Sequence, residues 1–348
     1  MLASCRGGGG TVTNGSEEFI LSVIGLTHSF AQKGGGRGEG KGPVHALRGV
    51  SFDLKKGECL AVVGESGSGK TTLARSLLRL VQPTGGEVSY RGTDVLTMNP
   101  DDLLAFRRKA QIVFQDPFGS LNPRLRAGPM LDEILQVHGD SVSRGTRQLR
   151  VAELLQLVGL HPSHAERYPH EFSGGQRQRL GIARALSVGP ELLILDEPVS
   201  ALDLSVQAQI LNLLRDLQER LALTIILVAH DLTVVRQVAD RVAVMYGGKV
   251  VEVSPVQGLF ETPVHPYTKG LLAAADPDAA SVRGEGPWDL LTGEPPSPIR
   301  PPAGCPFHPR CPHPAKDQEC AEKPPEVRGL PRGRKVACWK EIEGADRA

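Results

Sequence analysis

The stretch Gly64-Glu-Ser-Gly-Ser-Gly-Lys70-Thr71 lies between a short apolar run at residues 58–63 and a helically spaced segment at 70–80. It fits the pattern G-x-x-x-x-G-K-[ST], in which glycines let backbone N–H groups surround phosphate oxygens at the start of a helix. Lys70 would bring a positive charge to the terminal phosphates of a nucleotide, and Thr71 a hydroxyl to Mg²⁺. A glycine loop with a chance Lys-Thr pair is the alternative, which the strand–loop–helix context disfavours. The predicted phosphate-binding residues are Gly64, Glu65, Ser66, Gly67, Ser68, Gly69, Lys70, Thr71 and Thr72.

A second acidic motif follows the apolar run at residues 192–195. Continuous apolar runs of this kind are typical of buried parallel strands. At the end of such a strand, Asp196 can hold Mg²⁺ through water, and Glu197 can orient or deprotonate an attacking water. An acidic strand cap is the alternative, and the presence of the first motif argues against it.

A third motif, Phe172-Ser173-Gly174-Gly175-Gln176, precedes a segment with helical spacing. Ser173 is predicted to be the helix N-cap, and the two glycines let backbone amides face an anion. Because one fold needs only one phosphate cradle, a second anion site indicates a second nucleotide, contacted across an interface. The alternative is an ordinary glycine turn before a helix.

Composition limits the classes of protein to consider. The 348 residues suffice for one large α/β domain with an appendage, or for two modest domains. A net charge of +1 and an aromatic content of 4% argue against nucleic acid as a partner. The chain has no apolar run of about 20 residues and no apolar signal segment at its start. We therefore expect a cytoplasmic protein that needs a membrane-spanning partner for any membrane role.

The pattern along the chain predicts three regions. Residues 1–18 are rich in Gly, Ser and Thr and are expected to be disordered. Residues 19–275 carry the motifs on strands and helices, with an inserted helical lobe at about 103–188 and a hairpin around Gly247-Gly248. Residues 276–348 are dominated by Pro, Gly and charge, so this tail cannot build a large apolar core.

Read in order, the motifs resemble the ATP-binding cassette (ABC) family over residues 19–275. Besides the three motifs, the resemblance includes Gln115, Ser200-Ala-Leu-Asp203 and His230. It implies an α/β P-loop NTPase fold, with a RecA-like core, an antiparallel β subdomain and an inserted helical subdomain. It also implies ATP hydrolysis by two cassettes that pair head to tail, so that the third motif of each chain completes the ATP site of the other.

The resemblance implies further roles for single residues. Gln115 is similar to the glutamine that contacts Mg²⁺ or water and senses the membrane subunits. His230 is similar to the histidine at the γ-phosphate and, with Glu197 and Gln115, would complete the catalytic set. Asp203 belongs to the loop at the dimer seam. Phe30 resembles the aromatic residue that stacks on adenine, although a core phenylalanine is the alternative. The implied Mg²⁺ ligands are Thr71, Gln115 and Asp196.

Three longer stretches resemble one branch of this family, the dipeptide and oligopeptide importers, which also includes nickel and glutathione importers. They begin at Gln115-Asp-Pro-Phe, Glu197-Pro-Val-Ser and His265-Pro-Tyr-Thr268. The chain is most similar to the second of the two ATPases that usually pair in that branch. The implied partners are a homologous ATPase, two transmembrane permeases and an extracytoplasmic peptide-binding protein, with this chain on the cytoplasmic side of the cell membrane. A soluble ABC ATPase acting on ribosomes or DNA is disfavoured, because the chain has one cassette and no basic patch.

Four cysteines, Cys305, Cys311, Cys320 and Cys338, are separated by five, eight and seventeen residues in the tail. These spacings match none of the usual zinc or ferredoxin patterns, yet small segments of this kind often fold around a metal. The family resemblance implies a [4Fe–4S] cluster on the four thiolates. Zinc, with His308 and His313 as spare ligands, and unmetallated thiols are the alternatives.

Overall fold

The computed structural model describes residues 19–31, 42–138, 143–275 and 291–340. The stretch predicted to be disordered, 1–18, lies outside these residues.

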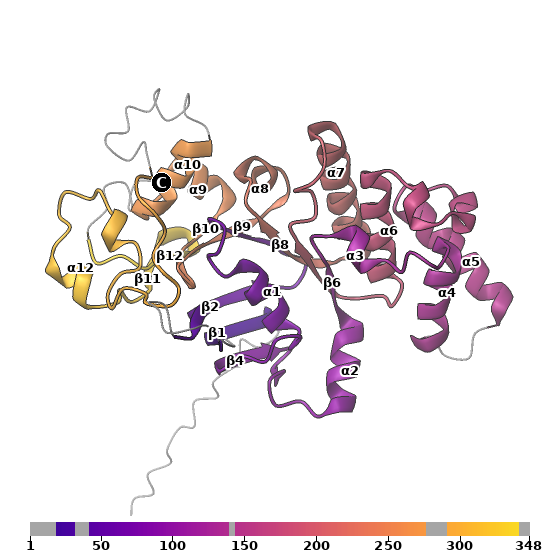
Figure 1. Ribbon diagram of the computed structural model, residues 1–348, viewed down its shortest axis with the longest axis horizontal. Coiled ribbons are helices and arrows are strands. Elements are labelled where there is room, and N and C mark those ends of the chain that lie inside the picture. The colour runs from indigo at the N-terminus through magenta and orange to yellow at the C-terminus, as the bar shows by residue number, and fades with distance from the viewer. Residues whose placement is uncertain (1–18, 32–41, 139–142, 276–290, 341–348) are drawn as a thin grey trace, which may run out of the picture.

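Two sheets organise the described part of the chain (Figure 1). The eight-stranded sheet has the order β11-β12-β10-β9-β3-β8-β7-β6, and the four-stranded sheet has the order β2-β1-β4-β5. The strands are β1 (Phe19–Phe30), β2 (Val44–Lys55), β3 (Cys59–Val63), β4 (Gly85–Tyr90), β5 (Thr93–Asp94), β6 (Ala110–Val113), β7 (Leu192–Asp196), β8 (Thr224–Ala229), β9 (Arg241–Tyr246), β10 (Lys249–Pro255), β11 (Arg328–Leu330) and β12 (Arg334–Val336).

The helices cover both faces of the larger sheet. Short 3₁₀ turns lie at Pro162–Glu166, Pro169–Glu171, His308–Arg310 and Pro331–Gly333. The α-helices are α1 (Lys70–Leu77), α2 (Pro100–Lys109), α3 (Pro117–Ser120), α4 (Ala127–His138), α5 (Arg144–Leu157), α6 (Gly174–Leu186), α7 (Leu204–Leu221), α8 (Leu232–Val238), α9 (Val256–Glu261), α10 (Pro266–Ala275) and α12 (Gln318–Glu322). Within the described residues, no helix combines the length and the apolar character needed to cross a membrane.

The centre of the larger sheet is parallel. Strand β3 pairs in parallel with β8 and β9, and β7 pairs in parallel with β8 and β6. Because the carboxyl ends of parallel strands meet at one edge, the loops after β3, β6, β7 and β8 converge there. Each of the candidate residues Lys70, Gln115, Glu197 and His230 follows one of these strands.

Strand β3 shows how the two faces are packed. Leu60 and Val62 join the apolar core formed with β1, β2, β4 and α1. Cys59, Ala61 and Val63 face the opposite core, to which α6, α7 and α8 contribute. All five residues are at most 1% exposed, so a strand buried on both faces positions the loop that follows it.

The helical lobe, α3 to α6, lies at one end of the molecule (Figure 1). The sequence pattern at 103–188 predicts mostly helices, but Ala110–Val113 forms β6 at the edge of the larger sheet. This strand is only four residues long and directly follows α2, so periodicity could not separate it from the helices around it.

The predicted hairpin is confirmed by the antiparallel pairing of β9 and β10. Gly247 and Gly248, which join the two strands, have φ values of 53° and 78°. Successive left-handed residues suit a two-residue hairpin turn, because its twist matches that of the strands.

The C-terminal tail, whose described residues are 291–340 and which is called the extension from here on, adds to the larger sheet. Strand β12 pairs antiparallel with β10 through Glu252 opposite Val336, and β11 pairs with β12. The extension therefore shares the sheet and core of the ATPase-like part, as Figure 1 shows beside α9 and α10. Proline-rich sequence without periodicity gave no sign of these strands.

Buried polar groups lie where the extension meets β10. The carboxylate of Glu252, 1% exposed, accepts the backbone N–H groups of Val264 at 3.0 Å and His265 at 2.7 Å. The ring of His265 is equally buried, and its Nδ1 accepts the N–H of Tyr267 at 3.0 Å. These buried hydrogen bonds anchor the His-Pro-Tyr-Thr stretch to β10.

We expect the variant His265→Gln to lose less stability at acid pH than the wild type. Burial lowers the pKa of His265 to about 3, below the value of about 6.5 for an unfolded chain. Between these values the unfolded state binds more protons than the folded state. The contribution of His265 to the free energy of unfolding therefore falls by about 1.4 kcal/mol for each pH unit below about 6.5.

Urea unfolding at about pH 7 and about pH 5.5 measures the difference. The wild type should lose about 1.4 kcal/mol more than His265→Gln over this range. His170→Gln, at an exposed histidine, is the control and should behave as the wild type. Equal losses in His265→Gln and the wild type would contradict the prediction.

Candidate nucleotide site

The glycine loop, residues 64–71, joins β3 to α1. Gly64 and Gly69 have φ values of 150° and 103°, which side-chain-bearing residues rarely adopt. A Cβ atom on Gly64 would lie 2.1 Å from the carbonyl oxygen of Met245, and one on Gly69 would lie 2.4 Å from that of Ala46. Glycine is therefore required at both positions for the loop to fit against β9 and β2.

The variant Gly69→Ala is expected to weaken ATP binding by about ten- to a hundredfold, because strain of about 1–3 kcal/mol must be relieved by shifting the loop. Titration with a fluorescent ATP analogue measures this. Gly189→Ala is the matched control, since Gly189 is also left-handed, at 65°, but a Cβ there meets nothing within 4 Å. The explanation would be wrong if Gly69→Ala bound ATP as the control does.

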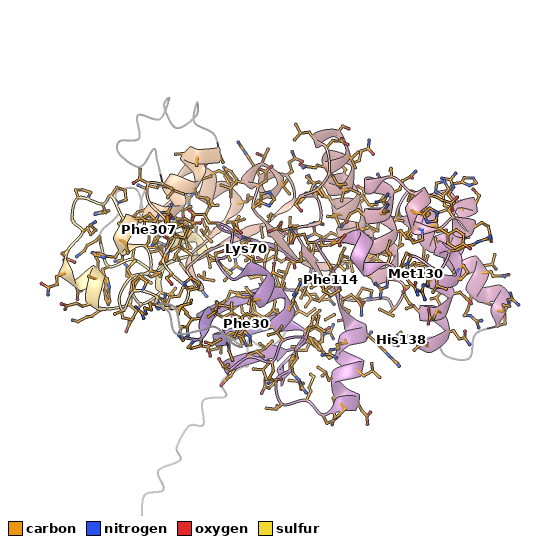
Figure 2. The ribbon with its side chains drawn as sticks, in the orientation of Figure 1. Phe30, Lys70, Phe114, Met130, His138 and Phe307 are labelled. Atoms are coloured by element: carbon orange, nitrogen blue, oxygen red, sulfur yellow. The ribbon has the colours of Figure 1, made fainter. Side chains whose placement is uncertain are left out.

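Lys70 and Thr71 extend from the first turn of α1 toward the sheet. Lys70 is 5% exposed, and its Nζ donates to the carbonyl oxygens of Gly64 at 2.8 Å and Glu65 at 3.0 Å. Burial lowers the pKa of Lys70, while the carboxylates of Glu197, Asp196 and Glu65 act in the opposite direction. Figure 2 shows Lys70 near the middle of the molecule.

The end of β7 fits a magnesium ion. Thr71 Oγ1 donates to Asp196 Oδ1 at 3.0 Å. Asp196 Oδ2 is buried and, among the residues that the structure describes, has no hydrogen-bond partner. Burial raises the pKa of Asp196, and the hydrogen bond from Thr71 partly offsets this effect. A carboxylate oxygen without a partner, next to a hydroxyl, suits a hard cation that prefers oxygen ligands.

Three side chains from three loops meet at Glu197. Gln115 Nε2 donates to Glu197 Oε2 at 2.8 Å, and His230 Nδ1 lies 3.6 Å from the same oxygen. The Glu197 side chain is 16% exposed, so it stays accessible to water. Its φ of 49° is unusual for a residue with a side chain, and strain of this kind is found at functional sites. The geometry lets Glu197 accept a proton from a water that Gln115 and His230 orient.

The third motif caps α6. Ser173 Oγ accepts the N–H of Gln176 at 3.4 Å, and the Gln176 side chain accepts the N–H of Ser173 at 3.1 Å. The predicted N-cap is thus confirmed. Gly174 and Gly175 pack on Leu202 and Val206, and a Cβ on Gly175 would lie 2.3 Å from Val206 Cγ1.

Asp203 and Phe30 are less directly linked to the site. Asp203 caps α7 by accepting the N–H of Val206 at 3.0 Å. Phe30 ends β1, is 42% exposed and packs edge-on against His28, with ring centroids 4.4 Å apart (Figure 2). This exposure argues against a core phenylalanine, and stacking on adenine stays a prediction.

The predicted metal cluster on the cysteines is not supported. The described residues include no group of three or more Cys, His, Asp or Glu side chains that could hold a metal ion. The backbone N–H of Cys305 does donate to the carbonyl oxygen of Cys320 at 2.8 Å, so the two segments are adjacent. Burial raises the pKa of the Cys305 thiol to about 11.

Two residues at the site were missed from the sequence. Tyr267 and Arg310 both contact Glu65 in the glycine loop. Tyr267 lies in a stretch that resembles the importer branch, but more than 200 residues separate both residues from Glu65, and no local pattern signals such contacts.

The fold and the site define a P-loop ATPase with its carboxylates at the ends of parallel strands. A family model described as "ABC transporter" matches residues 47–200, and one described as "Oligopeptide/dipeptide transporter, C-terminal region" matches residues 251–320. The chain belongs to the ABC transporter family, as an ATP-hydrolysing cassette with the oligopeptide-transporter type of C-terminal region. The predicted fold class and family are thereby confirmed.

Curated relatives extend the match over nearly the whole chain. The chain is 53% identical over 320 residues to a "Probable peptide ABC transporter ATP-binding protein" of Sinorhizobium fredii, covering 92% of this chain and 89% of the relative. It is 46% identical over 328 residues to the "Oligopeptide transport ATP-binding protein AppF" of Bacillus subtilis, covering 94% and 99%.

Solved structures show the same cassette. The ATP-binding cassette MJ0796, solved as a dimer bound to ADP and Pi, is 30% identical with a TM-score of 0.60, covering 68% of this chain and 99% of that one. CbiO1 of Clostridium perfringens, part of the transporter complex CbiONQ, is 26% identical with a TM-score of 0.63, covering 77% and 100%.

Proposed function

We propose that this chain powers the import of dipeptides or oligopeptides through a transporter in the cytoplasmic membrane. One observation carries the proposal. The same chain matches the ABC transporter model at residues 47–200 and the model of the oligopeptide/dipeptide transporter C-terminal region at 251–320. Relatives named as peptide and oligopeptide transport ATP-binding proteins support it. Residues 19–275 would form the ATPase domain and residues 276–348 its extension.

In the proposed reaction, the backbone amides of the glycine loop and Lys70 bind the phosphates of ATP. Thr71, Asp196 and Gln115 would hold Mg²⁺, which neutralises charge on the phosphates. Glu197 accepts a proton from the attacking water, and Gln115 and His230 orient that water.

A second cassette would complete the site. Ser173 and the two glycines after it begin α6 in the helical lobe, where free N–H groups can meet the γ-phosphate held by another chain. The dimeric state of the similar cassette MJ0796 supports this arrangement. In the proposal the other cassette is a homologous ATPase, and a peptide-binding protein outside the membrane delivers the cargo.

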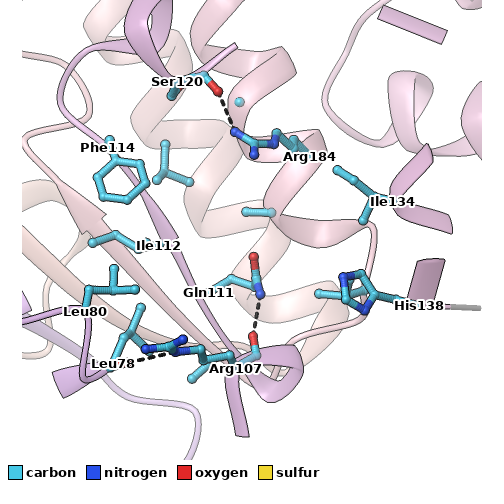
Figure 3. A pocket seen from close by; sticks show the side chains of 15 residues that line it. Leu78, Leu80, Arg107, Gln111, Ile112, Phe114, Ser120, Ile134, His138 and Arg184 are labelled. Atoms are coloured by element: carbon cyan, nitrogen blue, oxygen red, sulfur yellow. Dashed lines mark hydrogen bonds between the residues drawn. The ribbon is translucent and has the colours of Figure 1, made fainter. Parts of the chain in front are cut away.

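We propose that the seam cavity, a hollow of about 280 Å³ between the sheet and the helical lobe, receives a short helix of the permease. Figure 3 shows Ile112 and Phe114 of the sheet side opposite Ile134 and His138 of α4. The lining mixes apolar side chains with polar ones, which suits an amphipathic helix. The cavity opens beside the loop that begins at Gln115, so movement of the docked helix would reach the catalytic side chains directly.

The variant Ile134→Asp is expected to lower peptide uptake about tenfold, because a charge in the apolar wall must be desolvated when the permease helix docks. ATP binding by the purified chain should be unchanged. Leu149→Asp is the matched control, since Leu149 is 68% exposed on α5 of the same lobe and does not line the cavity. Normal uptake with Ile134→Asp would count against docking at this cavity.

The proposed cargo is tested in cells that lack the chain and receive either the wild type or Glu197→Gln. Uptake of a labelled tripeptide should return only with the wild type. Restored uptake of nickel or glutathione without peptide uptake would instead place the chain among the other importers of this branch. A metal cluster on the cysteines is not included, because the described thiols do not form a ligand group.

A further inference from the structure

One side chain of the C-terminal extension, Arg310, reaches the glycine loop. Its Nη1 donates to both carboxylate oxygens of Glu65, at 3.1 and 2.9 Å, and to the hydroxyl of Tyr246 at 3.1 Å. Its Nε and Nη2 donate to the carbonyl oxygens of Thr292 at 3.1 Å and Leu291 at 3.3 Å. The Arg310 side chain is only 6% exposed, so these partners hold it in one place.

Glu65 is tied to its surroundings by all of its polar groups. Its N–H donates to the hydroxyl of Tyr267 at 2.9 Å. Its carbonyl oxygen accepts from Lys70 Nζ at 3.0 Å and from the N–H of Ser68 at 3.2 Å. The residue that Arg310 holds is therefore itself bonded to the lysine that binds phosphate.

A rigid base supports the arginine. Phe307, three positions before Arg310, is 1% exposed and packs against Tyr246 and Tyr267, with ring centroids 5.2 and 5.5 Å apart. Figure 2 shows Phe307 on the side of the molecule formed by the extension. Pro296 and Ser297 of the extension also line a small hollow with Ser66 and Gly67 of the loop. The extension therefore contacts the loop at more than one point.

Charge gives this contact a consequence for binding. The Glu65 side chain is 23% exposed within a loop that receives a polyphosphate, and a free carboxylate there would repel the ligand. Arg310 places a permanent positive charge against it, with one nitrogen, Nη1, donating to both carboxylate oxygens. We propose that Arg310 is a positioning residue that neutralises Glu65 and thereby sets the affinity of the glycine loop for MgATP.

The full-length purified chain tests this inference, which rests on ATP binding by the loop and not on the cargo. Titration with a fluorescent ATP analogue and Mg²⁺ should show a dissociation constant about tenfold higher for Arg310→Ala, or about 1.4 kcal/mol. Glu65→Gln, which keeps the backbone groups of the loop in place, is the second single variant of this double-variant cycle. The double variant Glu65→Gln/Arg310→Ala should recover to within about threefold, because no carboxylate remains to be neutralised.

A merely structural role would predict no such recovery. Binding by Arg310→Ala at wild-type strength, or a double variant as weak as Arg310→Ala alone, would overturn the inference. Arg310→Gln carries the same expectations if the alanine variant does not fold. Lys335→Ala is the control, since Lys335 joins the extension to Asp53 at 3.2 Å without touching the loop. A wild-type chain that failed to bind ATP would contradict the proposed function itself.

Discussion

Glu197→Gln is expected to reduce ATP hydrolysis by about a hundred- to ten-thousandfold, the range associated with loss of a general base. The amide has nearly the same shape as the carboxylate but cannot take a proton from water. Lys70, Thr71 and Asp196 are untouched, so ATP should still bind. Because hydrolysis would no longer reopen the site, the variant should accumulate as an ATP-bound dimer. Phosphate release and size-exclusion chromatography with ATP measure the two effects.

The matched control for this prediction is Glu191→Gln. Glu191 immediately precedes β7, whereas Glu197 immediately follows it, and Glu191 pairs with Arg91 and Lys109 away from the glycine loop. Its replacement should leave hydrolysis unchanged. Near-normal hydrolysis by Glu197→Gln would show that another group accepts the proton.

Lys70→Met should weaken ATP binding by about a hundredfold, or about 2.7 kcal/mol, because a charged hydrogen-bond donor to the phosphates is lost. Methionine is unbranched and apolar, so it can fill most of the space of the buried lysine stem. The variant should neither bind ATP tightly nor form the dimer that Glu197→Gln accumulates. Titration with a fluorescent ATP analogue measures the affinity.

Lys109→Met serves as the control, because Lys109 is 55% exposed at the end of α2 and pairs only loosely with Glu191, at 3.5 Å. It should bind ATP as the wild type does. Retention of wild-type affinity by Lys70→Met would mean that the backbone of the glycine loop alone holds the phosphates.

The parts of the fold that could be predicted are those with local signals. The glycine loop follows a short apolar strand and begins a helix, so neighbouring residues specify it. The hairpin at Gly247-Gly248 depends on two residues whose backbone conformation only glycine adopts readily. Strand β6 was missed because four residues between helices have no distinguishable period. Strands β11 and β12 were missed because β12 forms by pairing with β10, and β11 by pairing with β12.

The residues of the site also divide into those that a local sequence signal predicts and those that only tertiary packing brings together. Asp196 and Glu197 could be proposed from a buried strand that ends in acids. The approach of Gln115 and His230 to one oxygen of Glu197 depends on the order of strands β6, β7 and β8, which only the family resemblance implied. The pairing of Arg310 with Glu65 has no sequence signal, because arginines are common and 245 positions separate the two residues. Contacts across such separations follow from tertiary packing alone.

The pairing of β12 with β10 bears on how this protein can be shortened for expression. Removing the chain beyond residue 290 would strip β10 of β12 and expose the N–H and C=O groups on that side of an apolar strand. An open edge of that kind recruits strands from other molecules and promotes aggregation. Among the described residues, the outermost strand on this side of the sheet is β11, three residues long, which begins at Arg328 and is followed by Pro331. So short and charged an edge gives another molecule little to pair with, and the extension thereby helps to keep the cassette soluble.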